Sequence, residues 1–357
     1  MTTTFRPPEA AELEQFLGRF VTDLGAALAG ANVVLGDRLG LYAAVAERQP
    51  ATAEDVARAS GTDERYVTEW LRGQAAGGYV EYDAATDTYS LSPAQAACLA
   101  DPQSATYVPG AFQIATSLYR DLPRLVEAYR DGEGVGWHEH SDDLFAGTER
   151  FFRPGYAANL VASWIPALDG VEAKLLSGAT VADVGCGHGA STLILAEAFP
   201  RSSFVGYDYH ERSIERARAA AAAAGLADRV RFEVAGADSF PGDGLDLVTM
   251  FDCLHDMGDP VGAARRVRQS LAADGTWMIV EPAAGDRVED NFNPVGRAYY
   301  GFSTLLCTPA SLSQDVGLAL GAQAGPAKIR GVVEQAGFGR FRTAAETPFN
   351  LVFEVRV

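Results

Sequence analysis

The sequence of 357 residues is poor in lysine and cysteine, and it has no long apolar run. Only Lys174 and Lys328 are lysines, so arginine carries the remaining positive charge. The four cysteines form no Cys-x-x-Cys pair and no zinc-like spacing, so we expect free thiols and no metal. No apolar stretch approaches the roughly 18 residues of a membrane span, and the N-terminus does not resemble a signal peptide. We therefore expect a cytoplasmic protein that binds no membrane.

Positive charge is scarce in the chain as a whole. Lysine and arginine together number 29 against 47 acidic residues, which gives a formal net charge of −18. Such a charge repels the phosphates of nucleic acids and the surface of anionic membranes.

The length exceeds what a single hydrophobic core usually serves, so we expect two domains.

The N-terminal third predicts a mainly helical, winged-helix-like domain, which we place at residues 1–105. An apolar stripe between Leu13 and Leu28 recurs at helical spacing and predicts a helix over residues 9–48. Two shorter helices are predicted within residues 51–76, followed by two strands that a turn at 83–87 joins. Helix, turn, helix and hairpin are the elements of a winged helix.

Winged helices often read DNA, which requires a basic face. Residues 51–100 contain three arginines against eight acidic residues, a net charge of −5. The helix in the place of a recognition helix carries Glu64 and Glu69. We therefore predict no nucleic-acid partner, which argues against a transcription regulator.

The remaining chain divides into an aromatic-rich segment and a regular α/β pattern. Residues 106–175 predict a helical connector and substrate lid. In residues 176–357 strands alternate with amphipathic helices, which predicts a parallel sheet covered on both faces. Two further strands close the chain as an antiparallel hairpin, and residues 290–325 form an insertion. The parallel strands are predicted at 180–184, 203–207, 230–234, 245–251 and 276–281.

A glycine-rich motif, Val-Gly-Cys-Gly-His-Gly, connects the first of these strands to the helix that follows it. Gly185, Gly187 and Gly189 let the backbone turn tightly and leave room for a ligand against the main chain. Together with Ala190, the first two glycines also satisfy the dinucleotide fingerprint. The glycines alone therefore leave a nicotinamide oxidoreductase open.

Asp183, two residues before the motif's first glycine, favours a different ligand. Dinucleotide sites direct helix N-terminal N–H groups at a pyrophosphate, which a carboxylate there would oppose. A sulfonium ligand with an α-ammonium group reverses that preference. The alternative is a structural aspartate that holds the loop.

Two more acidic residues follow later strands of the sheet. Asp208 ends the second strand, where an acidic residue accepts hydrogen bonds from ribose hydroxyls. Asp238 follows the third strand and can accept from an adenine amino group, although an aspartate in a turn is the simpler interpretation. Together with the glycine motif they predict an adenosine-type cofactor.

With these motifs in register, residues 176–357 resemble the class I methyltransferases. The resemblance implies a Rossmann-like seven-stranded sheet, parallel with a terminal antiparallel hairpin, and S-adenosylmethionine as cofactor. Phe251 and Asp252 end the fourth strand, where that family places residues against the adenosine or the methyl-bearing sulfur. The cofactor-binding residues that it implies are Asp183, Gly185, Cys186, Gly187, Asp208, Tyr209, Ala237, Asp238, Phe251 and Asp252.

The whole chain is similar to small-molecule O-methyltransferases with an N-terminal winged-helix-like dimerisation domain. His255 and Asp256, after the fourth strand, match that family's His-Asp pair, whose histidine is the general base. The family follows the pair with an aromatic residue, where this chain has Met257. We expect His255 to take the acceptor's proton, because a histidine suits the deprotonation of a phenol. Glu281, which ends the fifth strand, is expected to orient His255 or to contact the substrate.

The acceptor is expected to be small, apolar and aromatic or polyketide-like. Its pocket should lie over the carboxyl ends of the strands, as in open α/β sheets generally. A homodimer is implied by the resemblance, and the apolar stripe of the first helix suits it. The main alternatives are a protein of the same fold that binds the cofactor without transferring methyl, and a cofactor-sensing regulator. The candidate acceptor contacts are Phe152, Tyr156, Tyr299, Tyr300 and Ser303.

Overall fold

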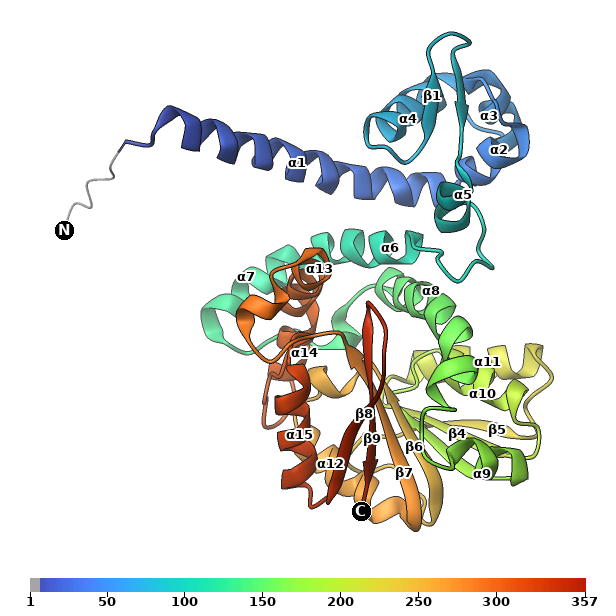
Figure 1. The fold of residues 1–357 in the computed structure, drawn as a ribbon, viewed down its shortest axis with the longest axis vertical. Helices are drawn as coiled ribbons and strands as arrows, with labels where there is room; N and C mark the ends of the chain where they lie inside the picture. The colour runs from blue at the N-terminus through green and yellow to red at the C-terminus, as the bar shows by residue number, and fades with distance from the viewer. Residues whose placement is uncertain (1–6) are drawn as a thin grey trace. The chain divides into compact units, whose positions relative to one another are not determined.

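The computed structural model describes residues 7–357 and divides the chain into two compact units, one up to Thr116 and one from Ser117. The first unit is mainly helical (Figure 1). It ends within α6, a helix that carries the chain into the second unit. Its elements are α1 (Ala10–Arg38), α2 (Leu41–Arg48), α3 (Ala53–Ser60), α4 (Glu64–Ala76), β1 (Glu81–Asp83), β2 (Thr88–Ser90), α5 (Pro93–Leu99) and α6 (Pro109–Leu118).

The single helix expected over residues 9–48 is in fact two helices. Gly40 adopts a left-handed conformation with φ of 68° and separates α1 from α2. Glycine adopts this conformation without the strain that a Cβ would cause, so it permits the turn. The hydrophobic periodicity is continuous across this break and does not reveal it.

Side-chain caps and an aromatic core stabilise the rest of the first unit. Thr52 and Asp55 form a capping box at the start of α3, and the Asp63 carboxylate caps α4. Trp70 of α4 meets Tyr42 of α2 edge to face at 4.9 Å between ring centroids. The predicted helices and hairpin of a winged helix are confirmed here.

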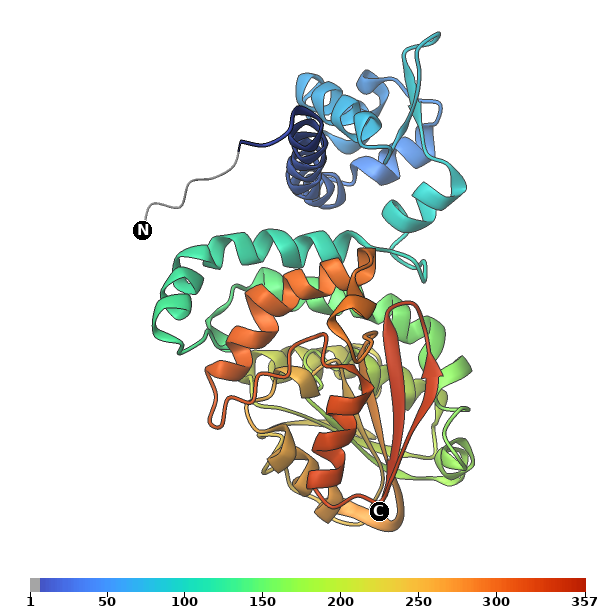
Figure 2. The same cartoon turned by 60° about the vertical axis from the view of Figure 1, so that its left-hand side comes forward.

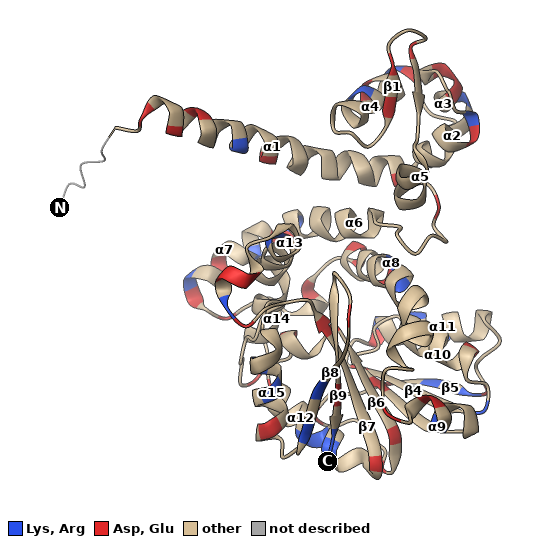
Figure 3. Cartoon of the chain, in the orientation of Figure 1, with Lys and Arg blue, Asp and Glu red and all other residues tan. Residues whose placement is uncertain are grey.

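Helix α1 leaves most of its apolar side chains exposed. No charged residue occurs between Asp23 and Asp37, a stretch without red or blue in Figure 3. By length and composition α1 is a candidate membrane span, with a mean hydropathy of 1.2 and 17% of the window buried. One such helix near an N-terminus is weak evidence of a membrane span. The sequence showed no apolar run of this length, because charged residues interrupt the helix.

The second unit begins with helices that lead to the sheet. Helix α8 continues directly into a π-helical segment, η3. These elements are η1 (Tyr119–Asp121), α7 (Leu122–Asp131), η2 (Trp137–Glu139), α8 (Asp142–Asn159), η3 (Leu160–Trp164) and α9 (Val171–Ser177).

Seven strands form the sheet of the second unit, in the order β5-β4-β3-β6-β7-β9-β8. The first five strands in this order are parallel to one another, and β9 pairs antiparallel with both β7 and β8. The predicted parallel sheet with a closing hairpin is therefore confirmed. The strands are β3 (Thr180–Val184), β4 (Ser203–Asp208), β5 (Val230–Val234), β6 (Leu245–Phe251), β7 (Leu271–Pro282), β8 (Arg340–Glu346) and β9 (Asn350–Arg356).

Helices cover both faces of this sheet (Figures 1 and 2). Alternate strand residues point to opposite faces, so Val181 packs into one core with α9, α10 and α11, while Ala182 packs into the other with α12 and α15. The remaining helical elements are α10 (Ala190–Ala198), α11 (Glu211–Ala223), η4 (Leu254–Asp256), α12 (Pro260–Ser270), η5 (Val288–Asn291), α13 (Pro294–Phe302), η6 (Ser303–Cys307), α14 (Thr308–Leu312) and α15 (Gly325–Gln335).

Candidate functional site

A cavity of about 420 Å³ lies at the carboxyl ends of β3, β4, β5 and β6. All parallel strands of a sheet present their carboxyl ends at one edge, and the loops that follow them shape a common crevice there. The cavity wall includes the glycine motif, the ends of β4 and β6, and one side of α8. Every residue that lines it belongs to the second unit.

The glycine motif brings bare backbone to the cavity. Gly185 has φ of 75°, and a Cβ there would lie 2.7 Å from the sulfur of Cys253. Gly187 has φ of 53°, and a Cβ there would meet no atom within 4 Å, because the residue borders open space. Gly185 is therefore required by close packing, and Gly187 by backbone conformation. The predicted ligand contacts Gly185, Cys186 and Gly187 all line the cavity.

Asp183 lies below the motif and does not line the cavity. Its carboxylate accepts hydrogen bonds from Ser191 (2.7 Å), Thr192 (2.6 Å) and Thr249 (2.9 Å). Burial raises the pKa of Asp183, and these three hydroxyls oppose the rise. Asp183 on β3 thus connects this strand by hydrogen bonds to β6 and to the first turn of α10. This is the structural role that the sequence left as the alternative to a direct contact with the cofactor.

Asp208, at the end of β4, organises the loop on which it borders. Its two carboxylate oxygens accept the backbone N–H groups of Gly187 and His210, each at 2.9 Å. Burial raises the pKa of Asp208, and these two hydrogen bonds oppose the rise. Asp208 lines the cavity together with Tyr209, and Ala237 and Asp238 line it after β5. The structure therefore brings the predicted nucleoside contacts together.

The chemistry of the wall fits a cationic nucleoside cofactor better than a dinucleotide. None of the described residues that line the cavity is a lysine or an arginine. A pyrophosphate usually meets helix N–H groups and basic side chains, whereas ribose hydroxyls and amino groups meet carboxylates. Asp208 and Asp238 supply such carboxylates at neighbouring strand ends.

One side of α8 forms the aromatic wall of the cavity. The residues that face it recur three or four positions apart, as one side of a helix requires. The ring of Phe145 stacks on His210 with centroids 4.3 Å apart and planes 11° apart. The predicted acceptor contacts Phe152 and Tyr156 both line the cavity. The lining residues of α8 are Phe145, Thr148, Glu149, Phe152 and Tyr156.

The sequence reasoning missed a polar contact between α8 and the glycine motif. Glu149 lies 3.0 Å from the Nδ1 atom of His188, and both residues line the cavity. The hydrogen bond from His188 holds the pKa of Glu149 below its usual range. The place of His188 within the glycine motif is the one feature of the sequence that points to this contact. Its partner on α8 lies 39 residues away.

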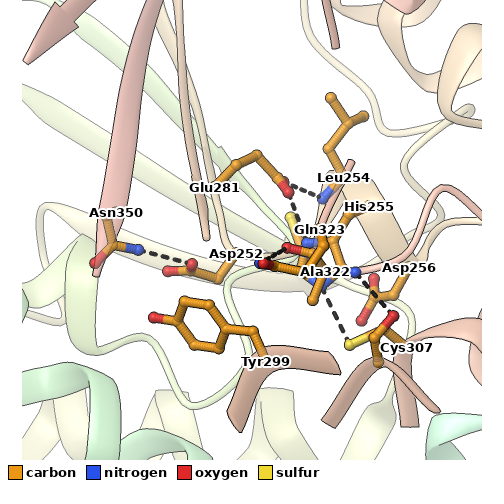
Figure 4. A network of polar contacts seen from close by, with 12 residues as sticks. Asp252, Leu254, His255, Asp256, Glu281, Tyr299, Cys307, Ala322, Gln323 and Asn350 are labelled. Atoms are coloured by element: carbon orange, nitrogen blue, oxygen red, sulfur yellow. Dashed lines mark hydrogen bonds and ion pairs between the residues drawn. The ribbon is translucent and has the colours of Figure 1, made fainter. Parts of the chain in front are cut away.

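A buried pair, His255 and Glu281, lies where β6 and β7 end (Figure 4). The Nδ1 atom of His255 is 2.6 Å from the Glu281 carboxylate, whose other oxygen accepts the Leu254 N–H at 3.0 Å. The Nε2 atom of His255 faces the Cys307 sulfur at 3.3 Å. Glu281 therefore contacts His255, which is one of the two roles that the sequence left open for it.

The environment of His255 favours its protonated form. Burial acts to lower the pKa of His255, but the Glu281 carboxylate and Cys307 outweigh it and raise this pKa well above the ordinary value. His255 does not line the cavity, and Cys307 of η6 covers its second nitrogen. The histidine that the sequence selected is thus held on both ring nitrogens, and neither it nor Cys307 lines the cavity.

Two carboxylates near His255 do line the cavity. Asp256 accepts a hydrogen bond from the Trp137 indole at 2.7 Å, and burial raises the pKa of Asp256 to about 6. Asp252 accepts hydrogen bonds from Tyr156 and Asn350, each at 2.8 Å. Of the catalytic candidates His255, Asp256 and Glu281, Asp256 alone reaches the cavity wall.

The candidate acceptor contacts in the insertion lie elsewhere. Tyr299 donates its hydroxyl hydrogen bond to the Phe349 carbonyl at 2.8 Å. The Ser303 hydroxyl accepts the Ala322 N–H at 3.1 Å. Neither these two residues nor Tyr300 lines the cavity. Tyr299 therefore connects the insertion to the turn between β8 and β9, and Ser303 connects two parts of the insertion. That these residues contact the acceptor stays a prediction.

Two family models match the chain. Residues 26–101 match the Rv2258c-like winged helix-turn-helix domain. Residues 175–318 match a methyltransferase domain. No curated protein matches the sequence.

Solved structures share the fold over nearly the whole chain at low sequence identity. The mitomycin 7-O-methyltransferase MmcR matches with a TM-score of 0.70 and 20% identity, covering 98% of this chain and 100% of its own. Human N-acetylserotonin methyltransferase, solved with S-adenosylmethionine, matches with a TM-score of 0.69 and 16% identity over 99% of both chains. NcsB1 from neocarzinostatin biosynthesis, solved with S-adenosylmethionine and 2-hydroxy-5-methyl naphthoic acid, has a TM-score of 0.61 and 18% identity, covering 92% of this chain and 95% of its own.

Proposed function

We propose that the protein methylates an oxygen of a small acceptor with S-adenosylmethionine. Residues 175–318 match a methyltransferase domain, and residues 26–101 match an Rv2258c-like winged helix-turn-helix domain. One observation carries the proposal. A single cavity is bounded by the glycine motif and Asp208 at one end and by an aromatic wall with Asp252 and Asp256 at the other. Cofactor and acceptor can therefore meet in one cavity.

The residues at the β4 and β5 ends suit the nucleoside part of this cofactor. The Asp208 carboxylate would accept from the ribose hydroxyls, and Asp238 from the adenine amino group. The backbone of Gly185 and Gly187 leaves room for the amino-acid part. When bound, the cofactor supplies an electrophilic methyl group, so the chain's own task is to align the acceptor and to accept a proton.

The aromatic wall supports an apolar acceptor. Phe145, Phe152 and Tyr156 of α8 and Trp137 of η2 present rings to the cavity, and Met257 adds an adaptable apolar side chain. Flat aromatic molecules bury well against such surfaces. The acceptor seen in NcsB1, a naphthoic acid, is of this shape.

We further propose that His255 receives the acceptor's proton. An unperturbed phenol, with a pKa of about 10, is mostly protonated at neutral pH and needs a base. Glu281 fixes the Nδ1 side of the imidazole, which leaves Nε2 as the nitrogen that can exchange a proton. Because Nε2 faces Cys307, the η6 segment Ser303–Cys307 has to move away before an acceptor reaches it.

Labelled methyl transfer tests the proposal directly. The full chain is incubated with S-adenosylmethionine that carries a labelled methyl group and with a panel of phenols and naphthols. Transfer of the label to an acceptor oxygen is the expected result. Calorimetry should also show binding of S-adenosylmethionine and no binding of NAD. Binding of NAD without S-adenosylmethionine would overturn the assignment.

A second function, cofactor binding without methyl transfer, has one observation in its favour. His255 does not line the cavity, and Cys307 covers its free nitrogen. A protein that only senses the cofactor needs no accessible base. It would bind S-adenosylmethionine by calorimetry and release no label to any acceptor, and the same two measurements distinguish it from the enzyme.

The exposed apolar side of α1 supports a homodimer. A helix with such a stripe buries it against another surface, and a second copy of α1 offers a matching one. Light scattering should give about twice the chain mass of 37.9 kDa. The apolar residues that are exposed on α1 are Leu13, Phe16, Leu17, Phe20, Val21, Leu24, Leu28 and Leu35.

A charge placed in the apolar stripe tests the dimer. Leu17→Glu should shift the protein toward monomer, whereas Gln15→Glu, also exposed on α1, should leave the mass unchanged. A monomeric wild type would exclude the dimer. If that monomer cosedimented with lipid vesicles and the Leu17→Glu variant did not, the stripe would be a membrane contact instead.

A further inference from the structure

Acidic side chains outnumber basic ones in the cavity wall, where Glu149 is paired with His188 and, behind the wall, with Arg153. Two histidines, His188 and His210, are its remaining ionisable nitrogen groups, and the described residues that line it include no lysine or arginine. Carboxylates without a basic partner in a cavity partly shielded from water favour a cationic occupant. The acidic residues that line the cavity are Glu149, Asp208, Asp238, Asp252, Asp256, Asp259 and Asp315.

Asp252 differs from the others in its backbone. It follows β6 directly and has φ of 49°, the left-handed region that a residue with a Cβ adopts at a cost. Two hydrogen bonds hold the side chain in place, from the Tyr156 hydroxyl on α8 and from the Asn350 amide on β9, each 2.8 Å long. The backbone at Asp252 is therefore locally strained, and its carboxylate lies at the cavity wall. Both of its hydrogen-bond partners are neutral.

The charged neighbours of Asp252 do not supply a counter-ion. Glu281 on β7 repels it, and His255 on η4 attracts it, but these two residues are paired with each other at 2.6 Å. Tyr299 on α13 faces it as a neutral phenol, because burial raises the pKa of Tyr299 far above neutrality. Burial raises the pKa of Asp252 to about 7, and Glu281 adds to the rise against Tyr156, His255 and Asn350. Near neutral pH the carboxyl therefore exchanges its proton.

S-adenosylmethionine and its product differ by one charge. The sulfonium and ammonium groups against one carboxylate give the methylated cofactor a net charge of +1, and S-adenosylhomocysteine is net neutral. Resting on the proposed function, we propose that Asp252 discriminates between the two, losing its proton when the cationic cofactor binds and keeping it when the neutral product binds. The same residue thereby favours loading of cofactor and release of product.

The direction of the pH dependence follows from linkage. Only ionised Asp252 attracts the cation, so the apparent affinity for S-adenosylmethionine scales with the ionised fraction of the free protein. That fraction rises from about one tenth at pH 6 to about nine tenths at pH 8 for a pKa near 7. The affinity for S-adenosylmethionine should therefore increase up to about tenfold over this range. The affinity for S-adenosylhomocysteine should change by less than about twofold.

Calorimetry of the full chain measures the proton directly. Titrations at pH 6.5 in two buffers of different ionisation enthalpy give the number of protons released on binding. S-adenosylmethionine, and the positively charged analogue sinefungin, should each release between about half a proton and one, and S-adenosylhomocysteine close to none. Asp252→Asn should abolish the release for both cationic ligands. Asp228→Asn, the same change at an exposed residue outside the cavity, should preserve it.

A second variant covers the case in which Asp252→Asn does not fold. Tyr156→Phe keeps the ring and removes one donor to the carboxylate, so the pKa of Asp252 rises and the proton release moves to higher pH. Equal proton release for cofactor and product, or unchanged release in both Asp252→Asn and Tyr156→Phe, would overturn the inference alone. Absence of binding by both adenosyl ligands would instead overturn the proposed function.

Discussion

The two ends of the cavity are built in different ways. At the end formed by β3, β4 and β5, a single carboxylate on Asp208 accepts backbone N–H groups from the adjacent glycine loop and from the turn after it. At the end formed by β6, side chains behind the cavity wall meet across long sequence distances: His255 and Glu281 of β7 are 26 residues apart, and His255 and Cys307 are 52 apart.

The difference separates binding from chemistry. Backbone groups in a tight loop have little freedom once the loop forms, so they suit a ligand that must always be held in the same way. Side chains on separate elements move when one element moves, and η6 carries the cysteine that covers His255. We expect changes at the first end to alter the affinity for both adenosyl ligands, and changes to the His255–Glu281 pair behind the second end to alter turnover.

The largest expected effect is at the second end. His255→Ala should lower turnover by roughly 10²–10⁴, the usual contribution of a general base. Its affinity for S-adenosylmethionine should stay near that of the wild type, because His255 does not line the cavity. Steady-state kinetics and calorimetry on the same preparations measure both quantities. If the variant instead lost cofactor affinity and kept turnover at saturation, the base would be sought at Asp256 or Glu281.

The pH profile sharpens this test. A base must be neutral to accept a proton, so the wild-type rate should rise with pH through the pKa of His255, which Glu281 and Cys307 hold well above the ordinary value against the effect of burial. Glu281→Gln keeps the shape of the side chain and removes its charge. The pKa of His255 should then fall, and the rising limb should move to lower pH. An unmoved limb would exclude His255 as its origin.

The first end should respond in binding. Asp208→Ala removes an acceptor that the ribose hydroxyls and two backbone N–H groups use, each charge-assisted hydrogen bond contributing about 1.5 kcal/mol or more. Two lost ligand bonds predict roughly 100-fold weaker binding of both adenosyl ligands by calorimetry. Asp228→Ala, an exposed aspartate before β5, is the matched control. Loss of turnover without loss of affinity in Asp208→Ala would erase the contrast between the two ends.

The sequence predicted the first end well because its signals are local. The alternation of strand and helix located the five parallel strands, and the glycine motif and Asp208 lie within a few residues of the strand ends that position them. The winged helix and the closing hairpin were equally visible as short-range patterns. The end of a strand determines where the backbone of the following loop lies. This end of the cavity is formed mainly by such backbone, so its position could be predicted.

Side-chain direction was less predictable. Asp183 stands at a position that the motif identified, yet its carboxylate turns to three hydroxyls, two of them in α10. His255 was identified by its neighbours in sequence, but its burial behind Cys307 depends on how the insertion packs. Tyr299 bonds the turn between β8 and β9, and Ser303 bonds another part of the insertion, partners that the sequence pattern did not indicate. Each of these outcomes depends on contacts between distant segments, which periodicity and spacing do not encode.

The smallest expected effect lies on α8, whose aromatic side borders the whole cavity. Phe145 stacks on His210 beside the Asp208 end, and such ring pairs contribute about 0.5–1.5 kcal/mol. Phe145 also lines the cavity, and the loss of one such ring contact with the cofactor in Phe145→Ala should weaken S-adenosylmethionine binding about threefold to tenfold by calorimetry. Phe145→Leu separates the causes, since it restores apolar area without a ring and should recover only part of the loss.

The control for this prediction lies on the same helix. Phe151 does not line the cavity, so Phe151→Ala should leave the affinity unchanged even if it lowers the melting temperature. Should Phe145→Ala lower turnover and spare affinity, α8 would act on the acceptor rather than on the cofactor. The aromatic wall would then serve the chemical step at the β6 end, and α8 could not be assigned to cofactor binding.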